Sequence, residues 1–355
     1  MPLKFKFFTL LALLFLVLPL FGAGCVLSLG SKAGAGVYKS FDKMDNWEAK
    51  NFVSQVKRKI TTISKVSVRQ MKFDPQNSQT IFLITAADGL YVTYNGGEQW
   101  NALFSRAGTF EDIAIDPQER NILYVARGNQ IFKSTDGGGQ WKMVYLESLA
   151  QKAIKSLAVD LIDTNIIYAG LSDGRLLRSI DAGQSWENWA NFSGKSVNAV
   201  MINPQSPQWI FAITPNAGVF RGDRDNTEWV NTTVNVDTRQ LRGINTYKAM
   251  VFDSTQTYGV ILATQYGLLK SPDAGDNWET IQLLSAAGSY NILSLAVNPL
   301  DNKEIYYGTT NALYKTVDGG QTWITEKTPT SYASRALLVK PEDPKIIYLG
   351  VYKLE

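Results

Sequence analysis

Few side chains in this sequence could carry catalytic chemistry. The 355 residues include no histidine and a single cysteine, Cys25. Without histidine, the chain cannot form a Ser-His-Asp or Cys-His nucleophile pair or a histidine-ligated zinc site. A single cysteine cannot form an intramolecular disulfide or a thiolate metal site. Any catalysis would therefore depend on carboxylates, Lys, Tyr or a bare metal ion.

Carboxylates are the catalytic set that the sequence could best supply. Glu111 or Asp112, together with Asp88 or Asp173, would lie on adjoining loops, where two acids could reach the separation used by glycoside hydrolases. The sequence has no G-x-x-x-x-G-K-[ST] phosphate loop, because its glycine run at 137–139 belongs to a hairpin. We favour a protein that is not an enzyme and needs no cofactor or metal, with hydrolysis as the alternative.

Basic residues give a second candidate site, for binding. Seven predicted strands end in a similar turn, and the residue five places earlier lies near the start of each strand. In chain order these residues are Arg69, Glu111, Lys155, Asn198, Lys248, Leu293 and Arg335. Two long loops could add Lys57, Arg58, Lys59, Arg239 and Arg242 to the same rim. The pattern predicts a cationic patch that receives an acidic protein segment or an anionic ligand; the alternative is scattered solvated charges paired with loop acids.

An eight-residue box ending in tryptophan predicts the elements that position these residues. The tryptophans run from Trp47 to Trp323 in six steps, a mean of 46 residues, which is the period of a propeller blade. The copy at 40–47 has Met44 in place of glycine, and the copy at 222–229 keeps mainly its tryptophan. The recurring residues are Trp47, Trp100, Trp141, Trp186, Trp229, Trp278 and Trp323, with Asp42, Asn95, Asp136, Asp181, Asp273 and Asp318 at the acidic position.

The composition of the box is typical of a hairpin turn. Its Asp and Ser or Thr can hydrogen-bond the backbone of the turn, and glycine supplies the positive φ that a tight hairpin needs. The tryptophan ring can pack on the neighbouring hairpin. Copies spaced around a ring cannot all converge on one site, so we interpret the acids of the box as structural rather than catalytic or metal-binding.

A second recurrent turn, of the Asp-Pro type, alternates with the box and gives each repeat four strands. The N-terminal copy contains only the last two strands, at 37–49, and the C-terminal copy only the first two, at 335–340 and 346–351. Pairing the two ends would complete a seventh blade and close the ring. The predicted fold is all-β, a seven-bladed β-propeller of four-stranded blades that occupies residues 36–355 as a single domain.

The N-terminal segment predicts export. Residues 1–24 combine the basic Lys4 and Lys6 with an apolar run at 7–21 and small residues at 22–24, as a signal peptide does. Because Cys25 follows at once, the segment resembles a bacterial lipoprotein signal, although Gly22 stands where that signal usually has Leu. The resemblance implies a lipid on Cys25, a tether at 25–35 and an extracytoplasmic protein anchored to the membrane. A cleaved secretory signal or a retained N-terminal anchor is the alternative.

The charge of the chain gives no argument for nucleic-acid binding. Removing residues 1–24 takes away Lys4 and Lys6 and lowers the formal net charge from +3 to +1. A global basic surplus of the kind used on polyanions is therefore absent from the mature chain.

The boxes and the strand order resemble those of the Asp-box, or bacterial neuraminidase repeat, propellers over residues 36–355. This superfamily includes sialidases, xyloglucan-type glycosidases, sortilin-like receptors and photosystem II assembly factors. The last group is the most similar in size and in its lipoprotein-like signal. The resemblance implies a monomeric, non-catalytic scaffold that binds a protein partner and acts as an assembly or stability factor for a membrane protein complex.

The resemblance leaves a glycan-binding protein or a glycoside hydrolase as the alternative. The sequence has no Arg-Ile-Pro segment of the kind usual in sialidases, and it has room for one propeller rather than the two that flank the cleft of the related endoglucanases. A quinoprotein, another class with this architecture, would need a cofactor constellation that the sequence does not show.

Overall fold

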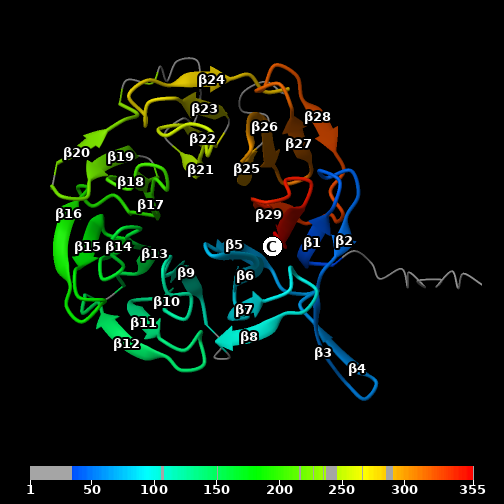
Figure 1. The fold of residues 1–355 in the computed structure, drawn as a ribbon, viewed down its shortest axis with the longest axis horizontal. Coiled ribbons are helices and arrows are strands. Elements are labelled where there is room, and N and C mark those ends of the chain that lie inside the picture. The colour runs from blue at the N-terminus through cyan, green and yellow to red at the C-terminus, as the bar shows by residue number, and fades with distance from the viewer. Residues whose placement is uncertain are drawn as a thin grey trace, which may run out of the picture. The chain divides into compact units, whose positions relative to one another are not determined.

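Seven four-stranded antiparallel sheets are arranged in a ring around a central axis (Figure 1). The structure, a computed structural model, describes residues 34–354 except 105–107, 150, 216, 227, 235, 237–245, 266 and 285–290. The predicted signal peptide, Cys25 and nearly all of the predicted tether lie outside the described residues. Strands form the regular structure of the described chain, which contains no helix long and apolar enough to cross a bilayer. The predicted all-β, seven-bladed propeller is confirmed.

Six blades are continuous in the sequence, and each runs from an innermost first strand to an outermost fourth strand (Figure 1). The first strands are β5 (Val68–Asp74), β9 (Phe110–Ile115), β13 (Ile154–Val159), β17 (Ala199–Ile202), β21 (Tyr247–Phe252) and β25 (Ser294–Asn298). The second strands are β6 (Asn77–Thr85), β10 (Leu123–Arg127), β14 (Ile167–Leu171), β18 (Trp209–Thr214), β22 (Val260–Thr264) and β26 (Asp301–Gly308). The third strands are β7 (Leu90–Thr93), β11 (Gln130–Ser134), β15 (Arg175–Ser179), β19 (Gly218–Asp223), β23 (Leu268–Ser271) and β27 (Leu313–Thr316). The fourth strands are β8 (Asn101–Phe104), β12 (Lys142–Leu146), β16 (Glu187–Asn191), β20 (Trp229–Asn231), β24 (Glu279–Ile281) and β28 (Ile324–Glu326).

The seventh blade joins the N-terminal and C-terminal strands. Its strands are β29 (Ala333–Val339), β30 (Ile347–Tyr352), β1 (Gly36–Ser40) and β2 (Glu48–Ala49), in that order outward from the axis. Strands β1 and β30 are antiparallel, with Gly36 opposite Val351 and Ser40 opposite Ile347. The pairing predicted from the two half-repeats is confirmed, and it closes the ring.

Apolar side chains fill the space between neighbouring blades. Phe82 of β6, for example, packs in one cluster with Leu123 and Val125 of β10. The second strand of a blade is covered by other side chains on both faces. The second strand β22, for example, is buried along its whole length. The fourth strand lies at the outside and is mostly exposed, as in β12. This packing holds the innermost strands in fixed positions around the axis.

Six of the seven boxes form the same turn. The hydroxyl of Ser134 donates to Asp136 at 2.8 Å, and the same carboxylate oxygen accepts the backbone N–H of Gln140 at 2.9 Å. Equivalent bonds recur at Asp42, Asn95, Asp181, Asp273 and Asp318. Hydrogen bonds, first from the Ser185 hydroxyl, lower the pKa of Asp181 to about 2. The aspartate therefore caps its own turn as a carboxylate, and Asn95 does so with its amide oxygen.

The turn of the box needs two consecutive residues with positive φ. In the box that ends at Trp141 these are Gly137 and Gly138, with φ of 73° and 98°. In the copy at 40–47, Lys43 and Met44 adopt φ of 59° and 78° although neither is glycine. Met44 is 1% exposed, so burial of its side chain offsets part of the backbone cost.

In three boxes, those of Trp100, Trp278 and Trp323, the tryptophan joins its blade to the preceding one. The indole N–H of Trp100 donates to the carbonyl of Lys50 at 2.7 Å, and that of Trp323 donates to the carbonyl of Gln282 at 2.6 Å. Each acceptor directly follows the outermost strand of the preceding blade. The sequence predicted that the ring would pack on the neighbouring hairpin; in these three boxes the structure shows that the indole N–H also links two blades.

In four boxes a basic residue immediately before the box, Lys39, Lys133, Arg221 or Lys315, contacts the following blade. Lys133 donates to the carbonyl of Ala182 at 3.1 Å, and Lys39 donates to the carbonyl of Gly96 at 3.1 Å. Both acceptors lie inside the next box along the ring. The sequence analysis missed this contact, although Lys or Arg recurs at this position as Lys39, Lys133, Arg178, Arg221, Lys270 and Lys315.

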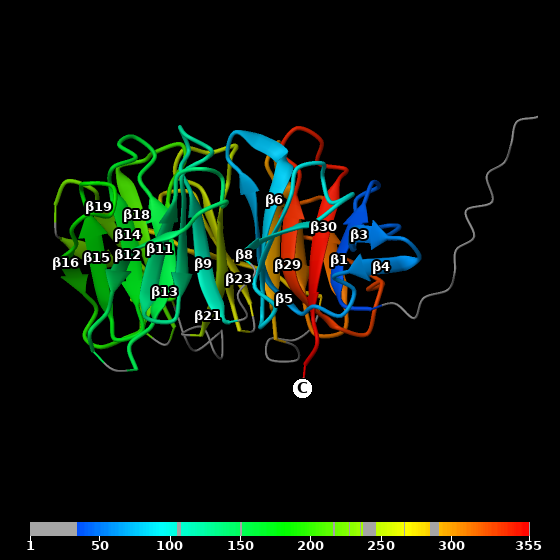
Figure 2. The same cartoon turned by 90° about the horizontal axis from the view of Figure 1, so that it is seen from below.

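A two-stranded hairpin, β3 (Phe52–Val56) and β4 (Lys59–Thr62), lies outside the seven blades where the sequence predicted a long loop. Its base is fixed, because the backbone N–H of Trp100 donates to the carbonyl of Phe52 at 2.8 Å and Ile63 is fully buried. The hairpin projects beyond β1 at the outer edge of the propeller (Figures 1 and 2).

Candidate functional site

The innermost strands surround a central cavity of about 1000 Å³. All seven residues that the sequence placed at equivalent positions line it, namely Arg69, Glu111, Lys155, Asn198, Lys248, Leu293 and Arg335. Asn198 and Leu293 directly precede β17 and β25, and the other five lie within the first three residues of their strands. The equivalent positions therefore meet at one end of the cavity.

A β-bulge places each of the five charged residues at this level. Val68 and Gln70 pair with consecutive residues of β6, so Arg69 has no partner on the neighbouring strand. The same skip in register occurs at Glu111, Lys155, Lys248 and Arg335. A bulge adds a residue to one strand and redirects its side chain, which is why bulges accumulate beside binding sites. A β-bulge at the same position of each strand therefore directs all five charged side chains.

The cavity carries a surplus of positive charge. Its lining contains five basic side chains and two acidic ones, a surplus of three, the charged residues being Arg69, Lys72, Lys155, Lys248, Arg335, Glu111 and Asp112. Lys72 was missed by the sequence analysis, which compared only one position in each strand. The charges are not evenly distributed around the ring, because both acids belong to β9.

Glu111 and Asp112 neutralise the basic side chains nearest to them. Glu111 accepts a hydrogen bond from Arg69 and lies 3.4 Å from the ammonium of Lys155. Asp112 is buried and accepts bonds from Lys72 at 2.6 Å and from the backbone N–H of Leu157 at 2.9 Å. This side of the cavity is therefore a satisfied ionic network that ties β5, β9 and β13 together.

Lys248 and Arg335 have no carboxylate partner among the described residues. Arg335 donates to the carbonyl of Leu293 at 3.3 Å, and no hydrogen bond or ion pair involves the Lys248 ammonium within the described part of the chain. Burial, followed by repulsion from Arg69, lowers the pKa of Arg335; burial, followed by repulsion from Arg335, lowers the pKa of Lys248. Uncompensated cations of this kind attract an anionic group, which would remove the repulsion.

The other basic residues expected at this rim do not share one location. Arg58, with Lys57 and Lys59, is exposed at the turn of the β3–β4 hairpin and does not line the cavity, so its predicted place at the rim is wrong. The loop at 51–67 folds back on itself as a hairpin at the outer edge (Figure 1). Arg239 and Arg242 lie outside the described residues.

The carboxylates considered for hydrolysis are held by other interactions. Besides the partners of Glu111 and Asp112, Asp173 forms an ion pair with Arg175 at 2.8 Å. Burial raises the pKa of Asp173, but hydrogen bonds and charge from Arg175 outweigh it, so the net shift is downward. A general acid of a glycosidase needs a raised pKa. Asp88 is exposed, and the described residues contain no cluster of three or more groups that could hold a metal ion.

No protein-family model matches the sequence. Among curated proteins, a xyloglucanase of Paenibacillus sp is 26% identical over 156 residues, which cover 39% of this chain and 15% of the xyloglucanase. The photosystem II assembly lipoprotein Ycf48 of Synechococcus sp. (strain CC9605) is 27% identical over 164 residues, which cover 45% of this chain and 44% of Ycf48. Each match thus spans less than half the length of the relative.

Solved structures share the architecture. The GH74 xyloglucanase from Xanthomonas campestris has a TM-score of 0.65 at 19% identity, covering 81% of this chain and 51% of that chain. Ycf48 bound to a D1 peptide has a TM-score of 0.59 at 18% identity, covering 81% of this chain and 93% of that chain. Likeness at these identities shows the fold alone. The chain is a seven-bladed β-propeller whose neighbours include Ycf48 and the GH74 xyloglucanases.

Proposed function

We propose that this protein is a non-catalytic binding scaffold that holds an acidic segment of a protein partner in its central cavity. The partner would belong to a membrane protein complex, which the propeller assists in assembly or stability. A lipid on Cys25 would keep the scaffold at the extracytoplasmic membrane surface, where such a complex is assembled.

One observation carries the proposal. Lys248 and Arg335 lie at equivalent bulged positions of the cavity without a carboxylate partner among the described residues, and the cavity has a surplus of three positive charges. A cavity of about 1000 Å³ has room for several residues of an extended segment. The likeness to Ycf48, solved with a D1 peptide, supports a peptide as the ligand. Of the four carboxylates that could support hydrolysis, Glu111, Asp112 and Asp173 are held in ion pairs instead.

The test is the binding of a fluorescent oligoglutamate peptide with a free C-terminal carboxylate, measured by anisotropy on the full chain. Substituting Lys248→Gln and Arg335→Gln should weaken binding by about tenfold or more, because each change removes a charge-assisted contact with a carboxylate of the peptide. The matched control is Lys142→Gln with Lys195→Gln, two exposed residues without ion pairs in the described chain.

Two results would overturn the proposal. Equal peptide affinity in the cavity variant and the control variant would show that the two cations do not form the site. Release of reducing sugar from xyloglucan by the unmodified protein, abolished by Glu111→Gln or Asp173→Asn, would favour the hydrolase alternative. A supporting result would be followed by capture of the partner from solubilised membranes, with the cavity variant as the negative control.

A further inference from the structure

The β3–β4 hairpin combines exposed apolar and basic side chains at its tip. Val56 is 68% exposed and Ile60 is 59% exposed, and between them lie Lys57 and Arg58 of the turn and Lys59, the first residue of β4. None of the three basic side chains forms an ion pair with a described residue. Five consecutive residues therefore offer three free positive charges flanked by two exposed aliphatic groups.

The hairpin is fixed at its base and free at its tip. Its base lies against the junction between β2 and β8, where Val53 packs on the buried cluster around Ile63 and Trp100. Gln99 also donates from its side chain to the carbonyl of Val53 at 3.1 Å. From this base the strands project past β1 at the outer edge of the propeller, as both views show (Figures 1 and 2). The tip is thus held away from the blades by a rigid support.

The two aliphatic side chains point to opposite faces of the hairpin. Val56 pairs with Lys59, and Gln55 pairs with Ile60, so Val56 and Ile60 occupy adjacent pairs. Side chains of adjacent pairs alternate between the faces of a two-stranded ribbon. A folded protein partner would contact one face, and it would leave the aliphatic group of the other face in water. A bilayer interface surrounds an inserted tip on all sides and covers both groups.

We propose that the tip of the β3–β4 hairpin inserts into the interface of a membrane that contains anionic phospholipid. Val56 and Ile60 would enter the boundary between headgroups and acyl chains, while Lys57, Arg58 and Lys59 extend to the phosphate and carboxylate groups of the lipids. Because the hairpin lies at the outer edge, the propeller would stand edge-on to the membrane, and the central cavity would stay open to solvent (Figure 2).

The test places a reporter beside the tip without altering it. In the full chain, Cys25→Ser removes the natural thiol, and Gln55→Cys gives a single site for an environment-sensitive nitrobenzoxadiazole dye. Vesicles of phosphatidylcholine with phosphatidylserine should shift the emission to the blue and protect the dye from iodide, whereas vesicles of phosphatidylcholine alone should do neither. The same dye at Ile180→Cys, on an exposed box turn, should stay in water with both kinds of vesicle.

Charge variants give the quantitative part of the test. Each basic residue near an anionic surface strengthens association by about fivefold, so Lys57→Gln, Arg58→Gln and Lys59→Gln together should lower the ratio of inserted to free tip by about 100-fold. The matched control is Lys142→Gln, Lys195→Gln and Lys327→Gln, which should leave insertion unchanged. Val56→Ser with Ile60→Ser should abolish the spectral shift.

Three outcomes would overturn this inference. The dye could stay accessible to iodide with phosphatidylserine vesicles, or the tip variant could insert as well as the control variant. A soluble oligoglutamate peptide could instead protect the dye at position 55 where vesicles do not, which would assign the hairpin to an acidic protein. Peptide binding in the central cavity is tested by the Lys248 and Arg335 variants, which leave the hairpin unchanged, so the two proposals can fail separately.

Discussion

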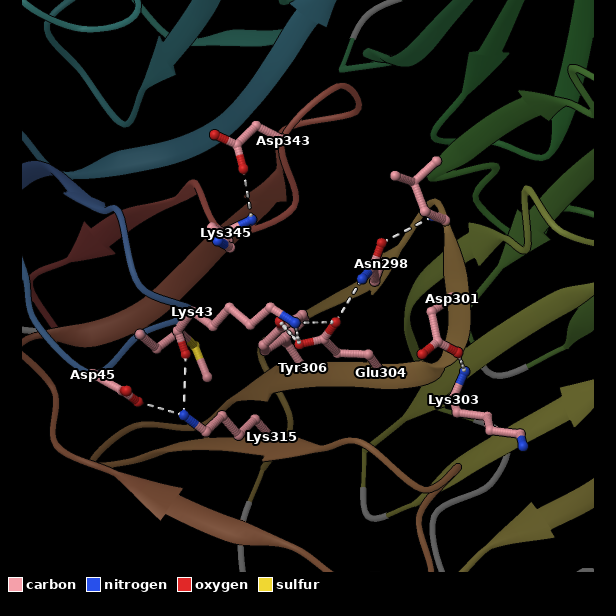
Figure 3. Close-up of polar contacts among 12 residues, drawn as sticks. Lys43, Asp45, Asn298, Asp301, Lys303, Glu304, Tyr306, Lys315, Asp343 and Lys345 are labelled. Atoms are coloured by element: carbon pink, nitrogen blue, oxygen red, sulfur yellow. Dashed lines mark hydrogen bonds and ion pairs between the residues drawn. The ribbon is translucent and has the colours of Figure 1, made fainter.

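Glu304 and Lys43 lie 261 residues apart in the sequence, yet their side chains form an ion pair of 2.8 Å (Figure 3). Glu304 belongs to β26, and Lys43 lies in the box of the closing blade, so the pair spans the junction at which the N-terminal strands complete the ring. Asn298 and Tyr306 also donate to the Glu304 carboxylate, which is 2% exposed. A buried carboxylate with three donors secures the closure.

Removing the cation of this pair should destabilise the protein. We expect Lys43→Met to lower the free energy of unfolding by about 2 kcal/mol, less than the ~3–5 kcal/mol for breaking a fully buried pair, because Lys43 is partly exposed and two other donors remain. Met has an unbranched side chain of similar length to Lys, so the substitution removes the charge without adding a branch at this positive-φ position. Urea denaturation measures the effect, and Lys303→Met, a change at an exposed lysine of β26 that has no ion pair with a described residue, should stay within about 0.5 kcal/mol of the unmodified protein. Equal loss in both variants would contradict the role of the pair.

The same carboxylate makes the closure sensitive to acid. Burial raises the pKa of Glu304, but the donors, first Lys43, outweigh it and the net shift is downward. A lowered pKa in the folded state stabilises the protein above the unfolded value of about 4.3, and this stabilisation is lost as the pH falls through the folded value. The stability advantage of the unmodified protein over Glu304→Gln should therefore be full at neutral pH and shrink below about pH 4. A difference that does not change with pH would refute the assignment.

The ring and its closure could be predicted because their signals are local and repeated. The residues that form each turn all lie within its own box, as the hydrogen bonds of Asp136 show. The two half-repeats each lacked two strands, so they could complete a blade only by pairing with each other. The Glu304 to Lys43 contact could not be predicted in this way. It depends on how two blades pack, and no pattern within either segment marks its partner.

The candidate site, too, could be predicted from the sequence where its signals were local and could not be predicted where it depends on strand pairing. The sequence placed Lys248 and Arg335 at equivalent positions because strand ends can be aligned by their turns. It could not show the bulges that present them, since a bulge such as that at Lys248 is set by the register between β21 and β22. Arg58 was misplaced because the chain from 52 to 62 pairs with itself, and this pairing carries the basic turn outward.

The link between blades through tryptophan can be tested with two matched substitutions. Trp100→Phe removes the hydrogen bond to the carbonyl of Lys50 and leaves a gap in a fully buried site, so we expect a loss of about 2–3 kcal/mol. The indole N–H of Trp141 is buried without an acceptor among the described residues. Trp141→Phe should therefore cost about 1 kcal/mol or less. Thermal or urea unfolding compares the two, and the reverse order would show that the bond does not join the blades.

Two box positions that have a positive φ without being glycine should respond in opposite directions to the introduction of glycine. Ala182 has a φ of 59° and a small side chain, so Ala182→Gly should relieve backbone strain and raise the stability by up to about 1 kcal/mol. Met44 has a φ of 78° but is buried in the closing blade. Met44→Gly should therefore lose about 2 kcal/mol, because the cavity outweighs the relief of strain. A gain in stability for both variants would show that φ alone governs the box.

Glu111 restrains the cavity, and its neutralisation should improve ligand binding. The carboxylate holds Arg69 and Lys155, so Glu111→Gln frees both cations and raises the surplus in the lining from three charges to four. We expect oligoglutamate to bind about fivefold more tightly at low salt, with the gain shrinking as added salt screens the charges. Glu187→Gln, which frees Arg178 on the outer part of a blade, should have no effect on the peptide affinity. Weaker binding by Glu111→Gln would mean that the carboxylate holds Arg69 and Lys155 in the orientation that receives the ligand, and that charge alone does not define the site.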